Sequence, residues 1–238
     1  MPPGDDLAPK PVARDEVSPV CEQGADAVTI TALRPRGAKG TSFTVELSNG
    51  ESLRLRADTV ASRGLNVGDA VVATDIHVWQ RDDSNRRALE AGLNFISYRP
   101  RSSKEVDAHL RRKSFDKAAR DHAIHRLRQL GYLDDAAFAR FWVESRETHR
   151  PKGQRALAWE LRQKGIADAI IEEVLARYGG DETALARTAA RKRAATIATA
   201  DYDQFRRKLG TFLARRGFSY EVVEQVVDEL WTERETVD

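Results

Sequence analysis

The stretch that predicts the fold is Leu110-Arg111-Arg112-Lys113-Ser114-Phe115, because the chain contains its pattern twice more. The other copies are Leu161-Arg162-Gln163-Lys164-Gly165-Ile166 and Leu213-Ala214-Arg215-Arg216-Gly217-Phe218, with their leucines spaced 51 and 52 residues apart. In each copy basic residues occupy the last turn of an expected helix, and a small residue then an apolar residue follow. Gly after a helix allows the left-handed conformation, and cations there complement the helix dipole. A pattern recurring at this spacing predicts stacked repeats.

An apolar helix is expected on each side of every copy. The preceding helices carry Leu89 and Leu93, then Phe138 and Phe141, then Leu185 and Ala189. The following helices carry Ile124 and Leu127, then Ile171, Val174 and Leu175, then Val222, Val223, Val226, Val227 and Leu230. The chain is therefore predicted to be mainly α, with three tandem three-helix repeats at residues 84–136, 137–180 and 181–238. Such units stack on their neighbours and predict an elongated, curved body.

Local signals support these helices. The sequence Ser102-Ser103-Lys104-Glu105 predicts a capping box, in which Ser102 accepts from the Glu105 amide and Glu105 reaches back. The stripe that contains Leu127 and Leu130 is expected to end at Gly131. The acidic pair at Asp134 and Asp135 precedes the next helix, where helix capping explains it better than acid chemistry.

Residues 25–83 predict a small β-rich module of three or four strands ahead of the repeats. Period-two alternation marks residues 28–31, 43–47 and 53–56, and residues 70–73 are the candidate fourth strand. Asn49-Gly50 predicts a hairpin with a type I′ turn, since both residues tolerate positive φ. Helical periodicity begins near residue 84. Residues 1–24 contain five prolines among acidic and small residues, and they are predicted to be a disordered tail.

The composition limits the classes of protein to which the chain can belong. The chain has 238 residues, 41% of them hydrophobic and 32% charged. Neither an apolar run near 18 residues nor an N-terminal secretory pattern is present, so a cytoplasmic protein without membrane contact is expected. The single cysteine, Cys21, excludes an internal disulfide framework.

Charge is distributed unevenly along the chain. Residues 1–83 hold 9 Lys and Arg against 13 Asp and Glu, whereas residues 84–238 hold 30 against 24. The net +6 of the second part indicates an anionic partner such as nucleic acid or an acidic protein surface. Arg makes up 30 of the 39 basic residues, which is equally typical of a GC-rich coding sequence.

The motifs of catalysis and metal binding are missing or incomplete. The glycine-rich residues 36–41 lack the spacing of a phosphate loop, which favours a loop between strands. His122 and His125 lie three residues apart, but no third ligand accompanies them. Trp79, Trp142, Trp159 and Trp231 could stack nucleobases, with core packing the default. The prediction is therefore a protein that is not an enzyme and holds no metal and no cofactor.

Recurring basic residues are the candidate binding site. They come once per repeat or beside the second repeat: Arg111, Arg112, Lys113, Arg146, Arg150, Lys152, Arg162, Lys164, Arg206, Arg207, Lys208, Arg215 and Arg216. If the repeats stack regularly, these side chains form a basic stripe suited to phosphates or an acidic protein groove. Helix-end capping explains the same residues, and the two roles are compatible.

Four ordered segments of this sequence resemble the RecX family. They are residues 99–102 followed by 110–113, residues 130–139, residues 150–153 with Leu157 to Ile166, and residues 215–220. The resemblance covers about residues 84–230. Ser114 departs from the glycine usual in the family, and the β-rich module is not common to all members.

The resemblance implies a regulator of recombination and DNA repair, including the SOS response. Its expected partner is the RecA recombinase in its filament on single-stranded DNA, whose ATPase and strand-exchange activities it would inhibit as a monomer. Direct binding of single- or double-stranded DNA is a further expectation. The alternative is a stand-alone nucleic-acid-binding helical repeat protein, supported by the net +6 of residues 84–238.

Overall fold

The computed structural model describes residues 27–37 and 40–236. These residues form two compact units, which meet in sequence between Val78 and Trp79. The predicted tail at residues 1–24, with Cys21, lies outside the described residues. The first unit contains the strands, and the second contains helices only.

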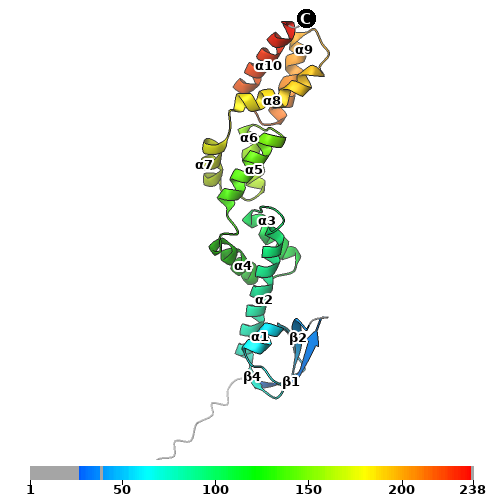
Figure 1. Ribbon diagram of the computed structural model, residues 1–238, viewed down its shortest axis with the longest axis vertical. Helices are drawn as coiled ribbons and strands as arrows, with labels where there is room; N and C mark the ends of the chain where they lie inside the picture. Colours follow the sequence, from blue (N-terminus) through cyan, green and yellow to red (C-terminus); the bar gives the residue numbers. More distant parts are fainter. Residues whose placement is uncertain (1–26, 38–39, 237–238) are drawn as a thin grey trace, which may run out of the picture. The chain divides into compact units, whose positions relative to one another are not determined.

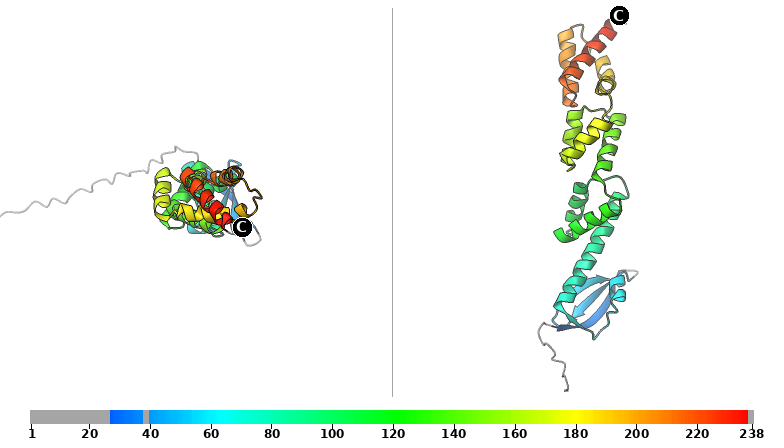
Figure 2. Two further views of the ribbon diagram at one scale, coloured as in Figure 1. Left: turned by 90° about the horizontal axis from the view of Figure 1, so that it is seen from above. Right: turned by 90° about the vertical axis from the view of Figure 1, so that its left-hand side faces the viewer.

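Four antiparallel strands form the predicted β-rich module (Figure 2). They are β1 (Ala27–Arg36), β2 (Ser42–Leu47), β3 (Ser52–Arg56) and β4 (Ala70–Val72), in the order β3-β2-β1-β4. Ile30 pairs with Leu47, and Val45 pairs with Leu53. All four of these side chains are buried, because period-two alternation places them on one face of the sheet.

The hairpin between β2 and β3 is present, but its predicted turn type is wrong. Residues 48–50 form a three-residue loop, in which the Gly50 amide donates to the Leu47 carbonyl at 3.0 Å. Gly50 has a φ of 84°, whereas Asn49 is not among the residues with positive φ. Only one left-handed residue is needed here, as in a type I turn followed by a bulge.

Helical structure begins earlier than the sequence pattern predicts. A short helix, α1 (Ala57–Ser62), follows β3 directly, and α2 (Ala73–Ile96) begins eleven residues before residue 84. The first half of α2 contains three Asp, one Thr and one Ser, which have low helix propensity. Buried Ile76 and Trp79 stabilise this half instead.

Nine helices of the described chain form three successive three-helix domains (Figure 1). The first has α2, α3 (Ser103–Arg112) and α4 (Lys117–Gln129); the second has α5 (Asp135–His149), α6 (Gln154–Gln163) and α7 (Asp168–Tyr178); the third has α8 (Glu182–Ala195), α9 (Tyr202–Arg215) and α10 (Tyr220–Glu235). The mainly α fold with three repeats is confirmed. The predicted boundaries stay predictions; α2 spans residue 84, and α5 begins at Asp135.

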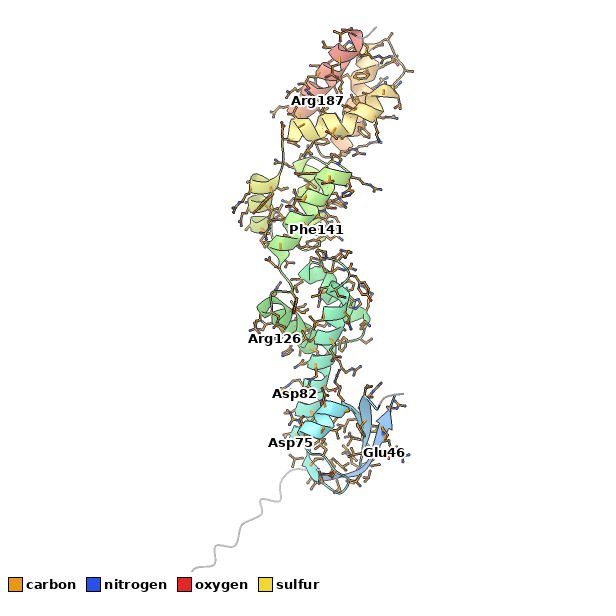
Figure 3. The ribbon with its side chains drawn as sticks, in the orientation of Figure 1. Glu46, Asp75, Asp82, Arg126, Phe141 and Arg187 are labelled. Carbon is orange, nitrogen blue, oxygen red and sulfur yellow. The ribbon has the colours of Figure 1, made fainter. Side chains whose placement is uncertain are left out.

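Each domain has its own core. Leu110, Leu161 and Leu213, the repeated leucines, are completely buried in the three cores. The expectation for Phe141 is wrong, because its side chain lies on the exposed surface of α5 (Figure 3) while Phe138 fills the core. Leu130 is also exposed, because it forms the C-cap after α4.

The predicted caps are present. Ser102 and Glu105 form the capping box of α3. Gly131 adopts a φ of 73° after α4. A carboxylate oxygen of Asp134 accepts hydrogen bonds from the amides of Ala136 and Ala137 at 2.8 and 3.0 Å. The acidic pair therefore begins α5, as the capping interpretation predicts.

Candidate interaction surface of the helical domains

The three copies of the basic turn end α3, α6 and α9 with the same geometry. Ser114, Gly165 and Gly217 occupy equivalent positions with φ of 62°, 79° and 84°. After each, an apolar residue donates its amide to the carbonyl of the repeated leucine: Phe115 to Leu110 at 3.2 Å, Ile166 to Leu161 at 3.1 Å and Phe218 to Leu213 at 3.4 Å. This is the Schellman motif, which satisfies carbonyls at a helix end.

The C-terminus of α6 meets the N-terminus of α3. Ser102 Oγ donates to the Lys164 carbonyl at 2.7 Å, and Lys104 Nζ donates to the Gln163 carbonyl at 3.1 Å. Lys164 Nζ reaches back to Glu105 Oε1 at 2.7 Å. Burial raises the pKa of Glu105, but Lys164 and Arg99 outweigh it and hold that pKa below its ordinary value. The basic end of one repeat thus docks on the preceding repeat.

The C-terminus of α9 meets the N-terminus of α6 in the equivalent way. The Gly153 amide donates to the Arg216 carbonyl at 3.0 Å, and Arg216 Nη1 donates to the Pro151 carbonyl at 3.1 Å. The backbones are so close that a Cβ on Gly217 would lie 2.4 Å from Ala156 Cβ. These two junctions explain why Lys164 and Arg216 recur at the same position: both connect neighbouring domains.

A second group of predicted cations surrounds one carboxylate. Glu160 accepts from Arg146 Nε and from Trp142 Nε1, each at 2.8 Å, and it also pairs with Lys152. Burial raises the pKa of Glu160, but these hydrogen bonds lower it to below its ordinary value. Arg146 and Lys164 also lie over the Trp142 ring, 4.3 and 4.8 Å from its centre. Trp142 is therefore held by its own chain and not free to stack a base.

Two further predicted cations are paired on the surface. Arg162 Nε lies 2.6 Å from Asp168 Oδ1. Arg206 Nη2 lies 2.6 Å from Glu224 Oε2, and this contact raises the pKa of Arg206. Six of the thirteen candidates, which we call the bonded cations, thus have partners inside the chain: Arg146, Lys152, Arg162, Lys164, Arg206 and Arg216.

The other seven candidates, which we call the open cations, are exposed. They are Arg111, Arg112, Lys113, Arg150, Arg207, Lys208 and Arg215. No acidic partner lies within ion-pair distance of any of them in the described parts of the chain. The junction geometry explains the first three: among the described residues, α3 belongs to the first of the three helical domains, so no preceding helical domain is present for its basic end to contact. The open cations remain the predicted binding residues.

Two exposed side chains, Arg193 and Trp159, lie outside the repeated basic turns. Arg193 lies near the end of α8 and faces the same hollow as Arg207 and Arg215. Trp159 on α6 is 61% exposed, one helical turn after Arg155. Arg193 is not among the predicted residues, because it belongs to no repeated turn. Core packing, the default expectation for Trp159, is wrong: Leu157 and Leu161 enter the core, and Trp159 between them lies on the outer face of α6.

Across residues 27–37 and 40–236, no three His, Cys, Asp or Glu side chains are grouped as metal ligands. His125 instead shares a hydrogen bond with Gln129 at 2.9 Å. Within the same ranges, no helix combines the length and the apolar character needed to span a bilayer.

Known proteins match both the sequence and the fold. Family models match as the first, second and third three-helix domains of RecX at residues 88–127, 134–175 and 180–227. Regulatory protein RecX of Chlorobium phaeobacteroides (strain BS1) is 36% identical over 150 residues, covering 63% of this chain and 97% of the relative. Regulatory protein RecX of Enterococcus faecalis is 30% identical over 206 residues, covering 86% and 77%.

Solved structures agree in fold. The crystal structure of RecX from Lactobacillus salivarius has a TM-score of 0.57 and 28% identity, over 63% of this chain and 97% of that one. A second crystal structure of regulatory protein RecX has a TM-score of 0.65 over 84% of this chain and 99% of that one. Its identity is 20%, so it supports the fold alone. The three domain models in order, together with these relatives, show that the chain belongs to the RecX family.

Proposed function

We propose that the chain binds the filament of a RecA-type recombinase on single-stranded DNA and inhibits its ATPase and strand-exchange activities. The observation that carries this proposal is the match of all three RecX domain models, in order, between residues 88 and 227. Two relatives, 36% and 30% identical to this chain, are named regulatory protein RecX. The role in recombination and DNA repair follows from the family resemblance.

The open cations offer a physical route to filament binding. They lie at Arg111 to Lys113 in the first domain, at Arg150 in the second, and at Arg207, Lys208 and Arg215 in the third. Modest contacts at separated points add through effective concentration when one chain meets several filament subunits. The partners of these cations would be DNA phosphates or acidic side chains of the filament.

The alternative function is nucleic-acid binding without a recombinase. The net +6 of residues 84–238 favours it, since positive charge alone supports sequence-independent binding to phosphates. Both proposals describe a cytoplasmic binding protein, not an enzyme, that acts as a monomer without metal or cofactor.

Co-sedimentation separates the two functions. Single-stranded DNA on beads is coated with a RecA-type recombinase and a non-hydrolysable ATP analogue, and retention of the chain is compared with retention on bare beads. The filament proposal predicts retention on coated beads at concentrations where bare beads retain little. Equal or greater retention on bare DNA would support the alternative and contradict the filament proposal.

A further inference from the structure

Four arginines lie on the outer face of the sheet in the first unit, two from β1 and two from β3. They form two rows across the strands, each with a hydroxyl side chain of β2 between its arginines: Arg34, Thr44 and Arg54, then Arg36, Ser42 and Arg56. We call these six residues the arginine face. Leu53 and Leu55 alternate with the arginines of β3 and are buried, so the arginine face is the side of the sheet opposite the core.

A bulge in β1 places its two arginines on this face. The pairing register with β2 shifts between Ile30 and Ala32, and Ile30 is completely buried. In a regular strand, residues separated by an even number of positions share a face, so Arg34 and Arg36 would lie on the same side as Ile30. The bulge reverses this alternation, and the side chain of Arg34 is 70% exposed.

Two of the four arginines keep an uncompensated charge. The other two are paired with Glu46 and Asp58, at 2.8 and 3.3 Å from Nε to a carboxylate oxygen, and Figure 3 labels Glu46 on the sheet. Arg36 and Arg54 have no acidic partner within ion-pair distance in residues 27–37 and 40–236. The Nε of Arg54 donates to the hydroxyl of Ser42 at 3.4 Å, which leaves its charge in place.

The first 26 residues of the chain carry the opposite charge. They hold two Lys and Arg against six Asp and Glu, a net of −4. They join β1 at Ala27, in the same unit as the arginine face. This tether keeps their carboxylates at a high effective concentration beside the sheet, so contacts too weak to hold separate molecules together can persist.

Asp15 and Glu16 have enough chain to reach the arginine face. Arg34 lies seven residues along β1 from Ala27, which is about 23 Å at roughly 3.3 Å per residue. Asp15 and Glu16 precede Ala27 by twelve and eleven residues, so an extended chain carries them up to about 36–40 Å. Glu22 precedes Ala27 by five residues and reaches only about 17 Å.

We propose that residues 1–26 fold back onto the arginine face, where Asp15 and Glu16 pair with Arg36 and Arg54. The contact neutralises the two arginines that have no acidic partner in the described chain. An anionic partner of this face must displace the segment, so the face is closed to other anions until then. This inference goes beyond the proposed function, which assigns no role to the sheet.

The single cysteine, Cys21, allows a direct test, because it lies in this segment and takes a nitroxide spin label without any substitution. Paramagnetic relaxation enhancement is measured at the backbone amides of the full, isotope-labelled chain. The proposal predicts strong enhancement at Thr44 and Arg54, because six residues of extended chain carry Cys21 about 20 Å from Ala27, close to their row. The enhancement should collapse in about 1 M salt, where the Debye length is about 3 Å.

Two variants identify the contact. The first combines Arg36→Gln with Arg54→Gln, and the second combines Asp15→Asn with Glu16→Gln. Each should lower the enhancement at Thr44 by at least about twofold, since exposed ion pairs are individually weak. Amide spectra of both variants without the spin label verify that they fold.

A control variant combines Arg81→Gln with Arg126→Gln, which removes the same charge from exposed arginines of α2 and α4. It should keep the enhancement at Thr44. Enhancement confined to the surroundings of Ala27, enhancement that survives in salt, or an equal loss in the control would overturn the proposal. Enhancement at Thr44 of an isotope-labelled chain mixed with a separate spin-labelled chain would also overturn it, because the segment would then come from another copy.

Discussion

Ser114 adopts the left-handed conformation that Gly165 and Gly217 adopt in the other two repeats. A side chain in this conformation costs about 1–2 kcal/mol, because Cβ crowds the following carbonyl. We expect Ser114→Gly to raise the free energy of unfolding by about 0.5–1 kcal/mol after the entropy cost of glycine. Urea melts measure this, with Gly131→Ser as the reverse change at a site with open space. A lower stability for Ser114→Gly would contradict the equivalence of the three turns.

Glu160 should make the second domain sensitive to acid. Its pKa is depressed in the fold, so it contributes stability above the unfolded value of about 4.3 and loses it as pH falls through the folded pKa. We expect Glu160→Gln to lower the free energy of unfolding at pH 7 by about 1.5–3 kcal/mol, the range for hydrogen bonds to charged groups. Urea melts should show a nearly constant difference from wild type at pH 7 and 5, and a smaller difference at pH 4 and 3, where the carboxyl group becomes protonated. A difference at pH 3 as large as at pH 7 would mean that the carboxylate charge is not the cause.

At the scale of elements, two glycines that follow helices can be compared by the stability lost when each is replaced by alanine. Gly131 and Gly217 are both left-handed, but a Cβ meets open space at Gly131 and Ala156 at Gly217. Gly131→Ala should cost about 1–2 kcal/mol from conformation alone. Gly217→Ala should cost clearly more, because the backbone of α6 must also move. Equal losses in a urea melt would mean that the third domain does not pack on α6 as described.

The helix faces of the second domain are tested by large-to-small changes. Phe138 and Leu161 are buried, so Phe138→Ala or Leu161→Ala should destabilise the protein by about 2–5 kcal/mol. Phe141 lies one turn from Phe138 on the exposed side, and Phe141→Ala should change stability by less than about 0.5 kcal/mol. If Phe141→Ala were as costly as Phe138→Ala, the orientation of α5 would be wrong.

The sequence predicts some elements well because their signals are local. The repeated leucine and the left-handed residue after it define the end of each middle helix, and Ser102 with Glu105 defines a beginning. The first half of α2 lacks such a signal, because it is polar and is stabilised by buried Trp79. Phe141 and Phe138 have the same chemistry, so only packing decides which one enters the core.

In the candidate site, too, local features could be predicted from the sequence and tertiary contacts could not. Spacing predicted that basic residues recur, but partners far along the sequence decide which of them are open. Lys164 meets Glu105 across 59 residues, and Arg216 meets Pro151 across 65 residues. No local sequence pattern predicts these contacts. Arg193 was missed for the converse reason, since it joins the hollow by tertiary packing and not by repetition.

For the whole molecule, the two sets of cations are expected to have different roles. Replacing all seven open cations with Gln should leave the melting temperature nearly unchanged, because surface changes of this kind are usually within about 0.5 kcal/mol each. Replacing the six bonded cations should lower it, because Glu105 and Glu160 then lose their partners. Inhibition of a filament should be lost with the open set at the same protein concentration. A large drop in melting temperature for the open set would show that those residues are structural.

The central claim is tested most directly by ATP hydrolysis of RecA-type filaments on single-stranded DNA while the wild-type chain is titrated in. We predict that the rate of hydrolysis falls as the chain is added. The variant in which Gln replaces all seven open cations should need at least about tenfold more protein for the same inhibition, which corresponds to a difference of about 1.4 kcal/mol in binding free energy. An unchanged rate of hydrolysis with wild-type chain equimolar to the recombinase would contradict the account.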